Sequence, residues 1–193
     1  MAKANVHGII AGVDEVGRGC IVGPVVAAAV IFNPKQPILG LTDSKKLTAK
    51  KREILAVNIR QQALAWAIGR AEPSEIDAIN ILQASLLAMA RAVQSLPVRP
   101  SWLQIDGNQY PNVDYPGETI VQGDLLIPEI SAASILAKVY RDKEMDILDA
   151  MYPGYEFARH KGYPTKLHKA HIQALGICAS HRRSFSPIKQ LLS

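Results

Sequence analysis

Cysteine, aromatic residues and long hydrophobic runs are all scarce in this sequence of 193 residues. The two cysteines, Cys20 and Cys178, form no CxxC pair, which argues against a disulfide scaffold or a cysteine-based zinc site and favours a reducing cytoplasm. The longest uninterrupted apolar stretch, residues 21–32, is too short to span a bilayer. Carboxylates at Asp14 and Glu15 also argue against a signal peptide. We therefore expect a cytoplasmic protein without a membrane partner.

Acidic residues are absent from the C-terminal end of the chain. The last 37 residues follow Glu156 and hold seven of the 22 basic residues, whereas the first 156 residues hold the other 15 and all 17 acidic residues. A second basic run, residues 45–52, lies near the front. Such an uneven distribution favours a polyanion partner, although a solvated face and a soluble tail would give the same pattern.

Length and composition fit a single α/β domain, for which a monomer is the simplest expectation. With 48% hydrophobic residues, the chain can bury roughly 70% of its extended surface and needs no metal or disulfide to fold. Apolar periodicity predicts strands over residues 9–14, 24–32, 63–71, 102–106 and 119–121, and helices over residues 48–61, 75–95, 131–151 and 166–175. Thr48 and Ser74 are the expected helix caps. The order predicts a mixed sheet with a basic, helical C-terminal portion.

Acidic residues follow three of the predicted strands: Asp14 and Glu15 after IIAGV, Asp106 after WLQI, and Asp124 after TIVQG. Strands that deliver acids at one edge of a sheet bring them together, and clustered carboxylates need a cation. Oxygen ligands favour Mg²⁺ or Mn²⁺. Two such ions suit phosphodiester hydrolysis, in which one activates the water and the other stabilises the leaving oxygen. Each acid taken alone is more simply explained as a solvated loop residue.

Asp14 and Glu15 raise a geometric difficulty, because neighbours on a regular strand point to opposite faces. Both reach one site only if the strand ends or kinks there, which Gly17 permits. Asp142 is a second choice for the fourth acidic ligand. Its place within a helix beside Arg141 favours a structural ion pair.

Six sequence blocks, in the same order, resemble the ribonuclease HII family. They are AGVDEVGRG (11–19), LTDSKKL (41–47), IDGN (105–108), ISAASILAK (130–138), HKGYPT (160–165) and HRRSF (181–185). The resemblance covers nearly the whole chain. It implies an RNase H-like fold, with a catalytic domain over residues 1–156 and a basic C-terminal helical segment over residues 157–193 packed on it. It also implies cleavage of RNA in RNA–DNA hybrids and 5′ to a single ribonucleotide in duplex DNA.

The resemblance also assigns roles to individual residues. The metal-binding carboxylates of the family correspond to Asp14, Glu15, Asp106 and Asp124. The glycine-arginine-glycine element of the family corresponds to Gly17, Arg18 and Gly19, and its substrate-stacking tyrosine corresponds to Tyr163. These residue types suit the task. Backbone without a Cβ can approach a sugar closely, and reading one 2′-hydroxyl is what separates RNA from DNA. Our mechanistic hypothesis is hydrolysis that leaves 3′-hydroxyl and 5′-phosphate ends.

Four further basic residues are candidate phosphate contacts, although plain surface charge explains each of them equally well. They are Lys45, Lys46, Arg182 and Arg183. Two features depart from the family pattern. Cys20 stands where proline is expected, and residues 125–127 after Asp124 are unusually apolar.

Two other functions remain open at this point. A different nuclease or a strand transferase of the same broad fold would share the acids but not the glycine-arginine-glycine element with Tyr163. A nucleic-acid-binding module without catalysis would explain the basic tail and leave the acids unexplained. Salt-sensitive binding without metal and without cleavage would indicate the latter.

Overall fold

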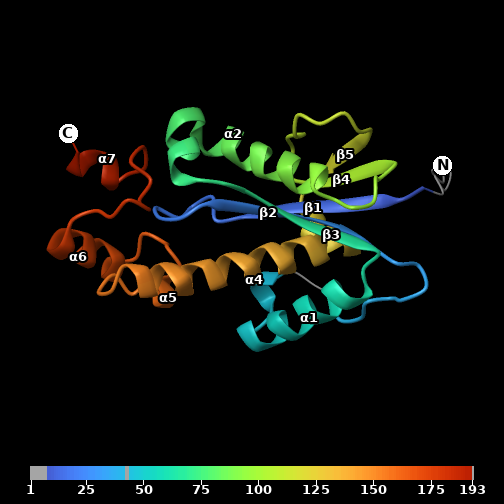
Figure 1. The fold of residues 1–193 in the computed structure, drawn as a ribbon, viewed down its shortest axis with the longest axis horizontal. Coiled ribbons are helices and arrows are strands. Elements are labelled where there is room, and N and C mark those ends of the chain that lie inside the picture. The colour runs from blue at the N-terminus through green and yellow to red at the C-terminus, as the bar shows by residue number, and fades with distance from the viewer. Residues whose placement is uncertain (1–7, 42–43, 193) are drawn as a thin grey trace.

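The computed structural model describes residues 8–41 and 44–192, in which five strands form one mixed sheet (Figure 1). The strands are β1 (Ile10–Val16), β2 (Val25–Ile31), β3 (Ala65–Ala71), β4 (Trp102–Asp106) and β5 (Gly117–Ile120). Their order across the sheet is β3-β2-β1-β4-β5. The first three pair antiparallel, whereas β4 runs parallel to both β1 and β5. The predicted mixed sheet is confirmed.

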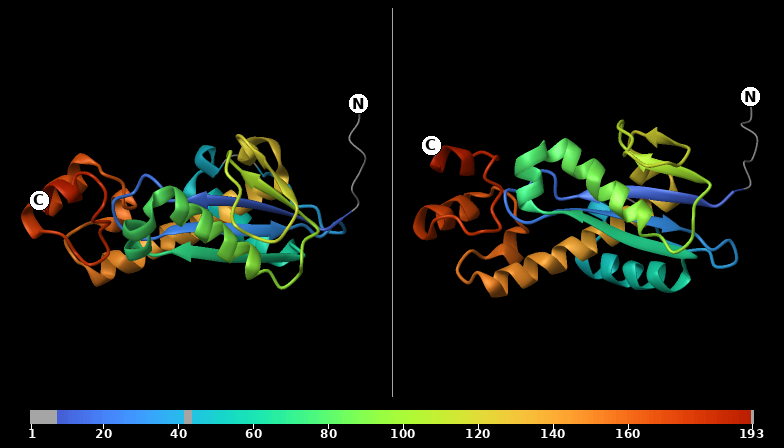
Figure 2. Two further views of the ribbon diagram at one scale, coloured as in Figure 1. Left: turned by 90° about the horizontal axis from the view of Figure 1, so that it is seen from above. Right: turned by 45° about the horizontal axis from the view of Figure 1, so that its top comes forward.

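Helices cover both faces of this sheet (Figure 2). The long ones are α1 (Ala49–Gln62), α2 (Pro73–Gln94), α4 (Pro128–Met151) and α6 (Lys166–Leu175). One face packs against α2, and the other packs against α4 with α1 beside it. The short helices are η1 (Ser44–Lys46), α3 (Gly123–Leu126), α5 (Phe157–His160) and α7 (Ile188–Leu191). The periodicity argument missed these four, because one turn carries no repeat of apolar residues.

Strand β2 lies in the middle of the packing and is buried along its whole length. Its residues alternate between the core beneath α2, which holds Ala27 and Ala29, and the core beneath α4, which holds Ala28. Small side chains allow both helices to approach closely. On the neighbouring strand β3, α2 approaches even more closely, because a Cβ at Gly69 would lie 2.1 Å from the carbonyl oxygen of Ala88 on α2.

The start of α2 differs from the prediction. Glu72, and not Ser74, is the N-cap. Its side chain and that of Glu75 form a reciprocal capping box, with Pro73 in the first turn. Within α2, Asn80 leaves the helical conformation at φ 68°, and its side chain accepts hydrogen bonds from the amides of Leu82 and Gln83. The kink restarts the helix beside the acidic end of the sheet.

Among the described helices, α2 is long and apolar enough to cross a membrane by length and composition. Its apolar residues serve another purpose here, because Ile76, Ala84, Ala88 and Val93 are buried against the sheet. Core helices of globular domains share this composition.

The C-terminal helices α5, α6 and α7 gather at one end of the molecule (Figure 1). Phe157 and Ile172 from this segment share a buried cluster with Ile21, Val22 and Met145 from earlier in the chain. The segment therefore packs directly on the loop between β1 and β2. The division at residue 156 stays a prediction.

Candidate metal centre and adjoining turn

Strand register brings the first two acids together. Pairing of β1 with the parallel strand β4 runs as far as Val13 with Ile105, so Asp14 and Asp106 are the next residues of the two neighbouring strands. The sequence suggested that Asp14 and Glu15 follow the end of the first strand. In the structure both lie inside β1. The strand that ends at the site is β4, whose last residue is Asp106.

The ending of β4 resolves the difficulty with Glu15. Odd-numbered residues of β1, such as Val13, face α2, whereas Asp14 faces α4 and interacts with Ser134. Because β4 stops at Asp106, Glu15 has no β4 neighbour beside it and its longer side chain can reach the same point. One oxygen atom from each of Asp14, Glu15 and Asp106 lies within 4.8 Å of the others. The three acids therefore form one group without a kink in β1.

The electrostatics of this group favour a cation. Burial raises the pKa of Asp14 well above its ordinary value, and the charges of Glu15 and Asp106 add to the effect. Burial also raises the pKa of Glu15, against the opposing charge of Arg18, whose Nη1 lies 3.2 Å from Glu15 Oε1. Oxygen-only ligands at this spacing suit Mg²⁺ or Mn²⁺. The residues present thus fit a divalent-metal centre.

The hydroxyl groups of Ser134 and Ser44 lie 2.9 Å apart, next to Asp14. Ser134 is on α4, and Ser44 is on η1 within the LTDSKKL block. This pair connects the second sequence block to Asp14. The sequence gave Ser44 no role beyond its place in this block.

Asp124 lies beside the group in the first turn of α3 and is nearly buried. Among the described residues, the group within 4.8 Å comprises the other three acids and does not include Asp124. The amides of Gly123 and Asp124 donate to Asp106 Oδ1, at 2.7 and 3.4 Å. The first turn of α3 therefore orients Asp106, and metal ligation by Asp124 stays a prediction.

Asp142, the alternative ligand, belongs to a different set of contacts. Its carboxylate lies 2.6 Å from Lys138 Nζ and 3.7 Å from Arg52 Nη2. The predicted structural ion pair is present, with Lys138 and Arg52 in place of the adjacent Arg141.

The loop after β1, residues 17–24, begins with the glycine-arginine-glycine turn and is held by two buried arginines. Arg141 donates to the carbonyls of Val22, Pro24 and Lys161. Arg182 donates to the carbonyls of Arg18 and Gly23. Both side chains are fully buried. The turn is therefore fixed to α4 and to the C-terminal segment.

The two glycines of this turn have different reasons to be glycine. Gly17 has φ 93°, and a Cβ there would lie 2.2 Å from Arg141 Nε. A Cβ at Gly19 would meet nothing within 4 Å, and Gly19 is exposed. The fold explains Gly17 alone, which leaves the open backbone of Gly19 available to a ligand.

A cavity of about 100 Å³ lies between this turn and α2. Glu15, Arg18 and Asp106 line one side, and Leu82 and Ser85 of α2 line another. The carboxylates of Glu15 and Asp106 are therefore accessible from solvent beside Arg18, an arrangement suited to a phosphate.

Comparison with known proteins identifies the family of this chain. The family model described as Ribonuclease HII matches residues 11–188. The chain belongs to the ribonuclease HII family. Ribonuclease HII of Methylococcus capsulatus (strain ATCC 33009 / NCIMB 11132 / Bath) is 57% identical over 184 residues, which is 95% of each chain. The protein is therefore a ribonuclease H, an endonuclease of the hydrolase class.

Solved structures support the fold. The ribonuclease H2 of Pyrococcus horikoshii OT3 is 25% identical, with a TM-score of 0.77 over 94% of this chain and 96% of that one. Bst-RNase HIII, solved in complex with Mn²⁺, is 20% identical, with a TM-score of 0.74 over 95% of this chain and 69% of that one. The RNase H-like fold expected from the six sequence blocks is confirmed.

The predicted phosphate contacts of this ribonuclease HII separate into two kinds. Lys46 and Arg183 are exposed, and the side chain of Lys45 lies outside the described residues. Arg182 requires a correction. Its guanidinium is fully buried on backbone carbonyls, so it holds the turn and is not at the surface where a phosphate would lie.

Tyr163 lies close to the glycine-arginine-glycine turn, with 42% of its surface exposed. Burial raises the pKa of the Cys20 thiol, while the charges of Arg141 and Arg182 and a hydrogen bond with the Tyr163 side chain act in the opposite direction. The amide of Ile21 also donates to the carbonyl of Gly162 at 2.9 Å. The structure thus brings together the turn and the tyrosine that the ribonuclease HII resemblance assigns to the substrate.

Three histidines of the C-terminal segment are buried: His160, His168 and His181. Burial lowers the pKa of His160, and it lowers the pKa values of His168 and His181 to about 4. In the unfolded chain both would titrate near 6.5, so the unfolded state binds more protons between about pH 4 and 6.5. Their contribution to stability is present above pH 6.5 and is lost as the pH falls toward 4.

We therefore expect these two imidazoles to lower the urea midpoint of unfolding as the pH falls from 6.5 to 4. The loss should be smaller in His168→Phe than in the natural protein, because that variant has one histidine fewer to protonate on unfolding. Equal slopes in His168→Phe and the natural protein would contradict a role for the buried imidazole.

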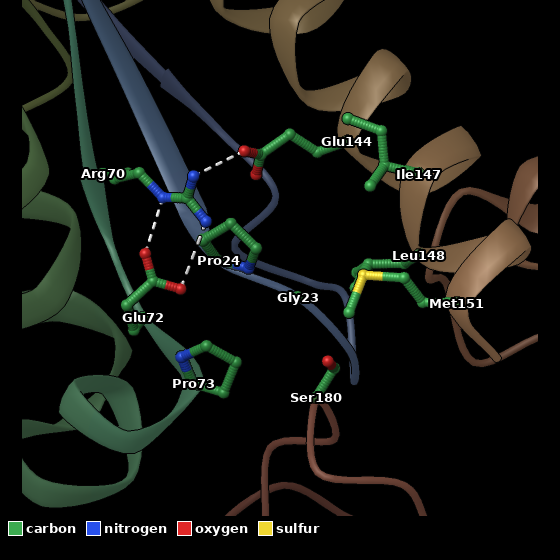
Figure 3. Close-up of a pocket in the computed structure, with 10 residues that line it drawn as sticks. All are labelled: Gly23, Pro24, Arg70, Glu72, Pro73, Glu144, Ile147, Leu148, Met151 and Ser180. Atoms are coloured by element: carbon green, nitrogen blue, oxygen red, sulfur yellow. Dashed lines mark hydrogen bonds and ion pairs between the residues drawn. The ribbon is translucent and has the colours of Figure 1, made fainter.

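A second cavity, of about 240 Å³, lies between β3, α2 and α4, away from the group of Asp14, Glu15 and Asp106 (Figure 3). Arg70 crosses it, with Nε 2.6 Å from Glu72 Oε1 and Nη1 2.6 Å from Glu144 Oε1. The two ion pairs link the end of β3 and the start of α2 to the middle of α4. We infer that these two ion pairs have a structural role.

Proposed function

We propose that this ribonuclease HII cleaves RNA in RNA–DNA hybrids, and 5′ to a single ribonucleotide in duplex DNA, leaving 3′-hydroxyl and 5′-phosphate ends. One observation carries the proposal. The group of Asp14, Glu15 and Asp106 lies directly beside an exposed, glycine-containing turn. A catalytic centre next to backbone that can approach a sugar closely is suited to cleavage at one chosen nucleotide.

The metal in this proposal is Mg²⁺ or Mn²⁺, held by Asp14, Glu15 and Asp106 with Asp124 as a further ligand. Bound divalent ions would supply an activated water and stabilise the leaving oxygen. The raised pKa values of Asp14 and Glu15 support a bound cation, because a cation relieves the repulsion between the carboxylates. The Mn²⁺ complex of Bst-RNase HIII, which shares the fold, is consistent with this choice.

The chain supplies the substrate contacts. The Gly19 backbone is open for the sugar that carries the 2′-hydroxyl, and Arg18 offers a forked cation to the adjoining phosphate. Tyr163 presents a half-exposed ring for a deoxyribose beyond the cleavage point. Lys45, Lys46 and Arg183 would contact phosphates further along the duplex. The protein acts as a monomer in the cytoplasm in this proposal.

A cleavage assay tests the proposal. The substrates are a DNA duplex with one ribonucleotide, an all-DNA duplex and an RNA–DNA hybrid, each with Mg²⁺, Mn²⁺ or EDTA. We expect one metal-dependent cut 5′ to the ribonucleotide, cleavage of the hybrid, and no cut in all-DNA. Cleavage of the hybrid alone would contradict the single-ribonucleotide part. Binding without any cleavage would indicate the non-catalytic module.

Alanine at each glycine of the turn should give opposite results. Gly19→Ala should leave the urea midpoint unchanged and lower cleavage at a single ribonucleotide by about tenfold, because the new methyl group occupies space next to the sugar. Gly17→Ala should instead destabilise the protein by roughly 1–3 kcal/mol, since the residue has positive φ and contacts Arg141. Steady-state cleavage and urea unfolding separate the two. Full activity in Gly19→Ala would rule out close approach at that position.

A further inference from the structure

A chain of hydrogen bonds runs through the C-terminal segment and ends on the backbone of Tyr163. His168 Nδ1 lies 2.9 Å from the carbonyl oxygen of Tyr163. His168 Nε2 lies 3.2 Å from His181 Nε2, and His181 Nδ1 lies 2.9 Å from the amide nitrogen of Cys178. The Cys178 thiol is 3.2 Å from the same Nδ1.

The chemistry of the two ends fixes which nitrogen of each imidazole carries the proton. A carbonyl oxygen only accepts, so His168 Nδ1 must donate to Tyr163. An amide N–H only donates, so His181 Nδ1 must accept from Cys178. With neutral rings, His181 Nε2 then carries the proton and donates to His168 Nε2. All four groups are satisfied in one arrangement, which runs from Cys178 toward Tyr163.

The loop that carries Tyr163, residues 161–163, is also held by contacts on its other side. The amide of Gly162 donates to His160 Nδ1, and the His160 ring stacks on His168 with centroids 4.1 Å apart. Arg141 donates to the carbonyl of Lys161 at 2.8 Å. Residues 161–163 therefore have little freedom, although the Tyr163 ring itself is exposed.

We propose that His168 and His181 are positioning residues, which hold the Tyr163 ring at the site where the ribonucleotide junction binds. Neither imidazole reaches the surface, so neither touches substrate. They act through the Tyr163 carbonyl, whose fixed position sets where the ring stands relative to Gly19. The inference rests on the proposed function, because it assumes that Tyr163 contacts the substrate.

A double-mutant cycle tests this role. His168→Leu removes the donor to the Tyr163 carbonyl, and Tyr163→Ala removes the ring but keeps the carbonyl. We expect His168→Leu to lower kcat/KM for the single-ribonucleotide duplex about tenfold when the ring is present, and to have no further effect in Tyr163→Ala. His168→Asn, whose amide can replace Nδ1 as the donor, should recover most of the activity. Equal effects with and without the ring would overturn the proposal.

A second variant and a second readout complete the test. If His168→Leu does not fold, His181→Asn takes its place in the cycle, because it keeps an acceptor for Cys178 but cannot reach His168. Nitrogen NMR of the imidazoles reads the tautomers without substrate: a proton on Nδ1 of His168 and on Nε2 of His181 is expected, and the reverse overturns the chain. Failure of the natural protein to cut either RNA-containing substrate would show separately that the proposed function is wrong, and would remove the positioning role with it.

Discussion

Replacing Asp14 with Asn is expected to abolish cleavage and to stabilise the metal-free protein. The carboxylate is buried beside Glu15 and Asp106, which raises its pKa, so its ionised form costs stability at neutral pH. Asparagine removes that charge without changing the shape. The catalytic loss should exceed about a thousandfold, because the site would lack an anionic ligand. The melting temperature in EDTA should rise by about 2–4 °C for each kcal/mol of relieved repulsion.

The pH dependence of stability tests the direction of the effect expected for Asp14→Asn. A carboxyl group with a raised pKa in the folded state keeps its proton longer there than in the unfolded state. The Asp14 carboxyl therefore lowers stability as the pH rises from about 4 through its folded pKa, opposite in sign to the buried histidines. The melting temperature of Asp14→Asn relative to the natural protein should accordingly rise with pH. Asp114→Asn, in an exposed loop, is the matched control and should change neither property. An active Asp14→Asn, or one less stable than the natural protein in EDTA, would contradict the assignment.

Added Mg²⁺ or Mn²⁺ should reverse the order of stability. A ligand that binds only the folded state stabilises it by an amount that grows with the logarithm of the ligand concentration divided by the dissociation constant. The natural protein should gain stability from the metal, whereas Asp14→Asn should gain little. This measurement needs no nucleic acid, so it tests the metal centre independently of the substrate.

Replacing Arg141 with Met should destabilise the protein by about 3–5 kcal/mol. Methionine fills a similar volume but leaves the carbonyls of Val22, Pro24 and Lys161 without their donor in a buried place. The same change frees the turn at Gly17 and the loop before Tyr163. We therefore expect cleavage at a single ribonucleotide to fall further than the loss of folded protein explains.

Urea unfolding and cleavage at a temperature where the variant is folded separate these two effects. Arg159→Met is the control, because Arg159 is exposed and its pair with Glu156 lies at the surface. Exposed pairs contribute about 0–1 kcal/mol, so this variant should match the natural protein. A similar small loss in Arg141→Met would show that water can replace the guanidinium.

Much of the fold could be predicted because it depends on local pattern. The five strands and four long helices follow the apolar periodicity, and Thr48 caps α1 as expected. The cap of α2 was wrong because Glu72 is an uncommon capping residue, and its role depends on a reciprocal contact with Glu75. Strand register lay beyond the sequence, so the pairing of Val13 with Ile105, which sets Asp14 beside Asp106, could not be predicted.

The site shows the same division. Residue type and order predicted that Asp14, Glu15 and Asp106 lie together, as they do, because strand ends of one sheet meet at one edge. Burial could not be read from the sequence, and this explains the error over Arg182. An arginine in a basic tail suggests phosphate, yet this one extends inward to the carbonyls of Arg18 and Gly23. Arg141 was missed for the same reason, since a charged residue within an amphipathic helix gives no sign that it is buried.

The anchoring of the turn by Arg182 has a consequence for the order in which the site forms during protein synthesis. A chain leaves the ribosome from its N-terminus, so Asp14, Asp106 and Asp124 emerge well before the residues around position 182. The carboxylates can gather while the turn beside them still lacks its second arginine and the loop of Tyr163 lacks the support of His181. The proposed substrate contacts are thus completed only after residues 181 and 182 have emerged, so a nascent chain holds the acidic residues before it holds the turn and the tyrosine in place.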